Sequence, residues 1–361
     1  MATIAEQVAA KHDSFTRSPL AAYAVENYLS ENALFNAVDF VPIVNLVPQA
    51  TFAKYSFQRT NVDASLVGFR NIGGEFPAGT TVPEVGEAAL AILGGQVVVD
   101  EEFQYARTPG DKGLENFVDQ EFRKKAAELL KAFNKYVISG DSTAQGAKQF
   151  DGLEKIVPSS RTHSTAISLN DYSDEKIRIA WVELYAILDA VPGANLIITT
   201  IEGVSAFRAL LATRNLSLAS ATVATAASVT GKKAGIPAVQ FEDKLVIGLP
   251  RAYFSAAELA IGEPFYVLRR DDTTGFKFVT PVNRPIVKMV LPNFMGGNST
   301  QKAGEVSIFT APVIEDLYAC AKGYISAGDA NITSINNNVP VTPSEGSTIT
   351  PTEDPEPDPG D

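Results

Sequence analysis

The amino-acid sequence predicts an α+β fold, and three features of the chain lead to that prediction. Residues 111–138 repeat apolar side chains at three- and four-residue steps, as one face of a helix does. Segments rich in β-branched and aromatic residues, bounded by glycine and proline, precede this helix and return after residue 262. Between them, residues 172–262 alternate helix-like and strand-like patterns. We therefore expect sheets and helices to share one chain of several subdomains.

Composition narrows the class of protein. The chain has 361 residues, of which 45% are hydrophobic and 20% charged, which is enough to bury a sizeable core. Its net charge of −12 argues against a protein whose main work is to grip nucleic acid or an anionic membrane through a basic surface. A single cysteine, Cys320, allows no intrachain disulfide. No signal peptide or membrane-spanning run is recognisable, so we expect a protein used where it is made.

The N-terminal part of the chain predicts two extended elements. Residues 1–47 are mildly amphipathic and interrupted by Pro42, and we expect an arm. Residues 48–108 carry strand-like patterns at both ends and a glycine-rich middle with little to build a core, which predicts a long hairpin. Because an isolated hairpin is only marginally stable in water, we expect this one to be stabilised by contacts with other parts of the structure.

The long helix over 111–138 is the strongest single prediction. Asp111 is a candidate N-cap and Gly140 stands just beyond the expected end. The basic residues on its other side are expected to form a solvated helix face. The residues expected to face the core include Phe117, Phe122, Leu129 and Phe133.

Beyond this helix the chain divides further. Residues 172–262 are expected to form a compact α/β unit, with a Ser/Ala/Thr-rich loop, LSLASATVATAASVTGKKAG, inside it. Strands are expected to return over 263–335 and to join residues 109–171. Residues 336–361 are rich in proline and acid and are expected to be disordered.

No constellation predicts catalysis, a cofactor or a metal. Two histidines, His12 and His163, lie in regions far apart in the sequence, so a triad or a multi-histidine metal site is not expected. The segment GDSTAQG lacks the Gly-Lys-Ser/Thr ending of a phosphate loop and follows a helix instead of a strand. We therefore expect a protein that is not an enzyme.

Two short motifs carry a resemblance to a known family. Ile138-Ser-Gly-Asp141 follows the long helix, and Phe150-Asp-Gly-Leu153 comes shortly after it. With the order of arm, hairpin, long helix, α/β unit and returning strands over residues 35–325, the chain resembles the major capsid protein of tailed bacteriophages, whose fold is shared with encapsulins. The family-like turn comprises Gly140, Asp141, Phe150, Gly152 and Leu153.

The resemblance implies a subdomain organisation. Residues 109–171 and 263–335 would form a peripheral subdomain that holds the spine helix, and residues 172–262 an axial subdomain. The hairpin and the arm would lie across neighbouring subunits, through permanent interfaces of ~2,000–5,000 Å² or more. The alternative for the hairpin tip is merely a flexible loop. The candidate contact residues at this tip are Gly68, Gly73, Gly74, Phe76 and Gly79.

The resemblance also implies partners and a place. Copies would assemble into pentamers and hexamers of an icosahedral head around double-stranded DNA, in a virion capsid built in the host cytoplasm, with no cofactor and no membrane. A separate scaffolding protein, a portal and decoration proteins would be further partners. The tip, residues 68–86, has no lysine, so lysine-asparagine cross-links are not expected. An encapsulin-like compartment is the first alternative, and an enzyme or surface-binding module the second.

Overall fold

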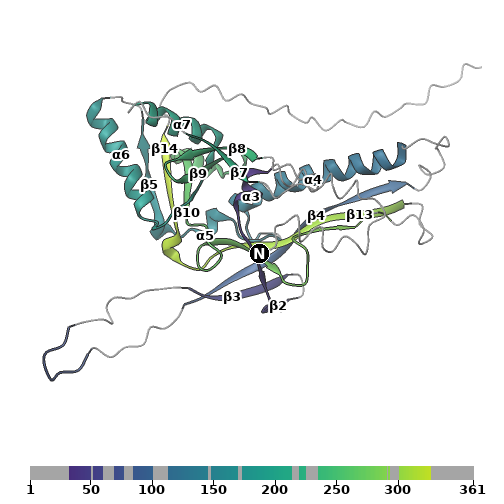
Figure 1. The fold of residues 1–361 in the computed structure, drawn as a ribbon, viewed down its shortest axis with the longest axis horizontal. Helices are drawn as coiled ribbons and strands as arrows, with labels where there is room; N and C mark the ends of the chain where they lie inside the picture. The colour runs from purple at the N-terminus through teal and green to yellow at the C-terminus, as the bar shows by residue number, and fades with distance from the viewer. Residues whose placement is uncertain are drawn as a thin grey trace, which may run out of the picture. The chain divides into compact units, whose positions relative to one another are not determined.

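The computed structural model describes residues 32–49, 52–59, 69–76, 84–100, 113–144, 148–169, 173–213, 219–224, 235–290, 292 and 301–326. Within these ranges the strands form two seven-stranded sheets (Figure 1). The first sheet contains β1 (Phe40–Ile43), β11 (Phe276–Pro281), β13 (Gln301–Ile314), β4 (Glu84–Asp100), β3 (Ala53–Arg59) and β2 (Leu46–Pro48) in this order, with β12 (Val287–Val290) paired to β13. The second sheet contains β5 (Thr162–Ser168), β14 (Cys320–Ser326), β10 (Glu263–Leu268), β6 (Leu196–Thr200), β9 (Lys244–Leu249), β8 (Gly235–Phe241) and β7 (Ala219–Ala224).

Antiparallel pairs dominate both sheets, and each sheet also contains parallel pairing. β1 pairs in parallel with β11 in the first sheet, and β5 with β14 and β6 with β9 in the second. Helices accompany the sheets. They are α3 (Ala33–Ala37), α4 (Gly113–Ser139), α5 (Leu153–Ile156), α6 (Asp174–Asp189), α7 (Ile201–Ala212) and α8 (Ala256–Ile261).

α4 is the predicted spine helix, and it lies along β4 and β13 (Figure 1). Its side chains Phe122, Leu129 and Phe133 are buried, at 0%, 4% and 0% exposure, as the helical spacing predicts. Gly304 on β13 lets the Phe122 ring approach the sheet, since a Cβ there would lie 2.7 Å from Phe122 Cζ. Phe133 packs among Phe35, Phe40 and Phe278, with ring centroids 5.2–6.4 Å away.

The segment before the hairpin is part of this core. Asn32 caps α3 by accepting a hydrogen bond from the Phe35 backbone N–H, 2.9 Å long. Leu34 and Phe35 on α3 are both 1% exposed and lie in the same apolar cluster as α4. Residues 33–40, which the sequence assigned to an arm over 1–47, contribute apolar side chains to the core of this chain, whereas Val44 and Val47 are 77% and 51% exposed.

The predicted hairpin strands pair as expected. β3 and β4 are antiparallel, from Ala53 opposite Leu90 to Arg59 opposite Glu84. β4 then continues beyond β3 and pairs with β13, from Ala91 opposite Thr310 to Asp100 opposite Gln301. One 17-residue strand therefore joins the base of the hairpin to the sheet under α4.

The second sheet has an apolar core on each face. Phe265 and Val267 of β10 face α6 and α7, whereas Tyr266 and Leu268 belong to the cluster around α4. β10 and β14 lie outside 172–262, and β10 pairs with β6 inside that range. The sheet therefore runs across the boundary predicted at residue 262. β7 also falls inside the Ser/Ala/Thr-rich segment, so residues 219–224 form a strand, and the loop prediction was wrong there.

Candidate functional site

The turn after α4 is built from two glycines whose backbones touch. Gly140 N–H donates to the Tyr136 carbonyl at 2.9 Å, and Gly152 N–H donates to the Gly140 carbonyl at 2.8 Å. A Cβ on Gly152 would lie 2.4 Å from the Ile138 carbonyl oxygen, and a Cβ on Gly140 would lie 2.4 Å from the Phe150 carbonyl oxygen. Only glycine fits at such a close backbone approach, so this contact locks the segment after α4 onto the helix end.

Charged and hydroxyl groups close the same turn. Asp141 Oδ1 accepts from the Thr143 backbone N–H at 2.8 Å and from the Thr143 hydroxyl at 2.6 Å, and it also contacts the Lys155 ammonium. Lys155 reaches Asp151 Oδ1 as well, at 3.0 Å. The hydrogen bonds from Lys155 and Thr143 hold the pKa of Asp141 well below its usual range. The family-like turn thus brings Gly140, Asp141 and Gly152 together, with Phe150 and Leu153 buried behind them.

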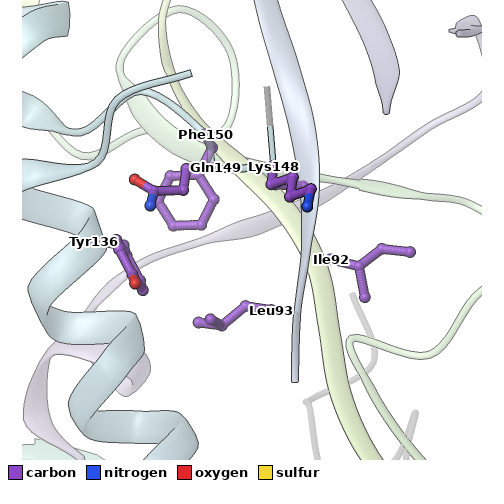
Figure 2. A pocket seen from close by; sticks show the side chains of 7 residues that line it. Ile92, Leu93, Tyr136, Lys148, Gln149 and Phe150 are labelled. Atoms are coloured by element: carbon purple, nitrogen blue, oxygen red, sulfur yellow. The ribbon is translucent and has the colours of Figure 1, made fainter. Parts of the chain in front are cut away.

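A shallow pocket of about 190 Å³ adjoins this turn (Figure 2). Tyr136 from α4, Leu93 from β4 and the segment Gln149-Phe150 surround it, whereas Ile92 points to the other side of β4 (Figure 2). Two of the side chains that line it, Tyr136 and Lys148, are titratable.

The hairpin tip is the second candidate site. The segment Phe69 to Phe76 turns at Asn71, whose carbonyl accepts from the Gly74 N–H at 2.9 Å, and Gly73 has φ +84°, which favours glycine. The Arg70 guanidinium stands 4.9 Å from the centre of the Phe76 ring. Phe69 and Ile72 are fully exposed, and Phe76 is 65% exposed. The tip therefore presents apolar side chains that have no apolar cover among the described residues.

The structure describes some of the sequence-predicted residues, and others lie outside the described ranges. Gly73, Gly74 and Phe76 lie at the described tip, whereas Gly68 and Gly79 lie outside the described residues, as does the expected N-cap Asp111. The side chain of Phe117 is also outside them. The arm residues 1–31 and the tail 336–361 fall outside as well, so those predictions stay predictions.

Sequence reasoning missed two buried charge clusters. Lys277 Nζ lies 2.9 Å from Glu315 Oε1, which also accepts from the Tyr55 hydroxyl at 3.0 Å and so links β3 to β11 through the residue that follows β13. Burial, followed by the charge of Glu315, raises the pKa of Tyr55 to about 12. No local spacing signals this cluster, because Tyr55 on β3, Lys277 on β11 and Glu315 just after β13 are distant in sequence.

The second cluster lies between α8 and the second sheet. The Lys322 ammonium contacts Glu258 Oε1, and their side chains are only 7% and 4% exposed. The Tyr266 hydroxyl donates to the same carboxylate at 2.7 Å. Burial lowers the pKa of Lys322. Both residues are isolated charges in apolar segments of the sequence, which is the only signal that could have pointed to them.

Other site chemistry is not seen in the described part of the chain. No three His, Cys, Asp or Glu side chains there are grouped as metal ligands would be. No helix of the described residues is long and apolar enough to cross a membrane.

Comparison with known proteins establishes the fold. No family model matches the chain, and no curated protein sequence matches it. The SrpI encapsulin from Synechococcus elongatus, solved as a holo complex, is 12% identical, with 81% of this chain and 87% of that chain covered and a TM-score of 0.50. The capsid of an empty GTA particle is 12% identical (82% and 97% covered, TM-score 0.46). The capsid of Myoviridae phage XM1 is also 12% identical (82% and 92% covered, TM-score 0.42).

The encapsulin comparison confirms the fold class and the resemblance predicted from the sequence. The chain has the α+β capsid fold that tailed-phage major capsid proteins share with encapsulins. The two lower TM-scores add nothing to that conclusion, and at 12% identity the likeness concerns the fold alone.

Proposed function

We propose that this chain is the major capsid protein of a tailed phage, a structural subunit that assembles into pentamers and hexamers of an icosahedral head around double-stranded DNA. The observation that carries the proposal is the uncovered apolar tip of the hairpin on a capsid fold. Phe69, Ile72 and Phe76 expose large apolar surfaces that a monomer in water has no reason to keep together.

A second uncovered surface supports assembly between copies. Side chains of β4 alternate, so that Val97 and Val99 are buried at 3% and 1% exposure beneath α4. Ile92 and Val98 point to the opposite face of the sheet and are 59% and 50% exposed. Burying apolar area of this kind is worth roughly 25 cal/mol per Å², so contacts between copies at the tip and at this face would stabilise a shell.

The finer organisation belongs to the same proposal. The first sheet with α4 would act as the peripheral subdomain. The second sheet with α6 and α7 would act as the axial subdomain, which then takes in β5, β10 and β14 from outside the expected range 172–262. Residues 1–31 would act as an arm to neighbours. A scaffolding protein, a portal and decoration proteins are the proposed further partners, and the virion capsid is the proposed location. The role is structural, and no enzymatic step is proposed.

An encapsulin-like compartment is the second candidate, because the SrpI encapsulin shares the fold over most of both chains. The two candidate functions differ in what the assembled particle encloses. A capsid would hold nuclease-protected DNA of uniform length, whereas a compartment would hold a co-purifying protein and no genome.

Electron microscopy of the purified full-length chain tests the shared part of the proposal. We expect closed particles of uniform diameter, and sedimentation should show little free subunit at high concentration. A chain that stays monomeric at high protein concentration would contradict a shell role. Particles taken from the native host, treated with nuclease and then analysed for DNA and protein, decide between head and compartment.

A further inference from the structure

One side of α4 carries a row of lysines that the fold leaves in solvent. Lys124, Lys131 and Lys135, which we call the basic stripe, are seven and four residues apart and therefore share one side of the helix. All three are exposed, whereas Phe122 and Phe133 on the opposite side are fully buried. The basic stripe thus points away from the sheet that α4 covers.

The acidic residues near the basic stripe neutralise only part of its charge. Lys124 is 66% exposed on its side chain and pairs with Glu121 at 2.7 Å. Glu128, on the same side, is engaged by Lys125 at 2.6 Å. Lys131 and Lys135 form no salt bridge with any acidic residue in the part of the chain that the structure describes. A local positive surface is therefore retained in a protein whose net charge is −12.

The chemistry of this side favours a polyanion over another protein. None of the large apolar side chains found exposed among the described residues lies on α4. A stable protein interface needs a largely apolar, fully desolvated centre, which this side of the helix lacks. A phosphate backbone needs only cations, since its binding comes from the release of condensed counterions. Lysine is a flexible point charge and suits contacts that do not read a base sequence.

We propose that the basic stripe is the contact surface for the phosphate backbone of the packaged double-stranded DNA. Eleven residues separate Lys124 from Lys135, or about 16 Å at 1.5 Å per residue, which spans roughly five phosphates of one DNA strand. This inference rests on the proposed capsid function and adds to it an orientation: the side of α4 that faces away from the first sheet lines the interior of the shell. Three lysines per subunit give a weak contact, which many subunits repeat along the DNA.

The test compares two full-length variants with the same change of charge. In the first, Lys124, Lys131 and Lys135 are each replaced by glutamine. In the matched control, Lys176→Gln, Arg178→Gln and Arg208→Gln remove three cations from exposed positions on α6 and α7. Binding of a fluorescent 30-base-pair DNA of mixed sequence is measured by anisotropy, with unassembled protein, as a function of salt from roughly 50 to 200 mM.

We expect the stripe variant to bind DNA roughly tenfold or more weakly at low salt. The slope of log K against log salt should fall in magnitude by about 2 to 3, because three phosphate contacts are lost. The control should keep most of the wild-type slope. Equal losses in both variants, or wild-type binding that is undetectable at about 50 mM salt, would overturn the inference.

The DNA-contact inference and the shell proposal can fail independently of each other. Both variants change only exposed side chains, so both should still form particles under the microscope. Particles that form from the stripe variant but retain less nuclease-protected DNA would support the inference directly. If wild-type protein forms no particles at all, the shell proposal fails, whatever the DNA titration shows.

Discussion

At the scale of single residues, the aromatic cluster under α4 holds the first core together. Phe133 is 0% exposed and contacts three other phenylalanine rings. Replacing it with alanine removes these contacts and leaves a cavity, so Phe133→Ala should lower the free energy of unfolding by about 3–5 kcal/mol. Urea denaturation of the unassembled subunit measures this. Near-wild-type stability would show that the apolar face of α4 is assigned wrongly.

Gly152 offers a sharper residue-scale test. An alanine Cβ there would lie 2.4 Å from the Ile138 carbonyl oxygen and 2.6 Å from the Gly140 nitrogen, both backbone atoms that cannot rotate away. We expect Gly152→Ala to cost about 2 kcal/mol or more in unfolding free energy. The matched control is Gly95→Ala, where the nearest atom is the flexible Lys125 side chain at 3.3 Å. The control should be neutral or slightly stabilising, and similar losses in both would refute the backbone lock.

The buried pair of Lys322 and Glu258 predicts a non-additive effect. Lys322→Met leaves the Glu258 carboxylate buried without its cation, which should cost about 3–5 kcal/mol of unfolding free energy. Adding Glu258→Leu removes the orphaned charge and should restore most of that loss. A double-mutant cycle by thermal and urea denaturation gives the coupling. Additive losses would mean that the two side chains do not depend on each other.

At the scale of elements, the base of the hairpin is fastened to the first sheet, whereas its tip is exposed. β3 and the first part of β4 form the hairpin, whereas the second part of β4 belongs to the sheet beneath α4. Tyr55 and Lys277 both contact Glu315 and fasten the hairpin base. This arrangement holds the base rigidly through buried contacts while the tip keeps its apolar side chains in solvent.

The tip should therefore matter for assembly and not for folding. Replacing Phe69, Ile72 and Phe76 together with serine should leave the unfolding transition of the subunit unchanged, because these side chains are exposed. We expect particle yield to fall strongly, at least tenfold. Val44→Ser with Val182→Ser, which removes exposed apolar side chains elsewhere, is the control. Urea denaturation measures the unfolding transition, and light scattering and microscopy measure the particle yield. Normal particles from the tip variant would show that the tip is only a loop.

At the scale of the whole molecule, we predict that the C-terminal segment is not needed for assembly. Residues 339–361 contain six acidic residues, no Lys or Arg, and prolines that forbid a regular helix or central strand. We expect such a segment to build no core and, in the proposed head, to be repelled by packaged DNA. A chain ending at Asn338 should therefore still form particles in nearly wild-type yield, measured by sedimentation and microscopy. Failure of the shortened chain under conditions where the full chain assembles would make the segment a structural clasp.

Much of the fold could be predicted because its signals are local. The apolar spacing over 111–138 specifies α4 to within two residues at its start and one at its end, since one period determines both helix and buried face. The glycines of the turn are recognisable for a related reason, because only a residue without a Cβ allows the Gly140–Gly152 contact. Alternation and glycines in 48–108 likewise predict the β3–β4 hairpin.

The amino-acid sequence by itself therefore determined the fold class, the spine helix and the hairpin pairing. The tertiary structure alone decided what depends on contacts between distant segments. Residues 33–40 pack in the core, and residues 219–224, whose Ser/Ala/Thr-rich sequence has no strand pattern, form a strand because they pair with β8. The second sheet includes strands on both sides of residue 262. The tertiary structure also brought Lys322 to Glu258. The physical reason is that helix periodicity and glycine geometry depend on residues close together in the sequence. Strand partners and buried ion pairs depend on packing between segments that are far apart in the chain.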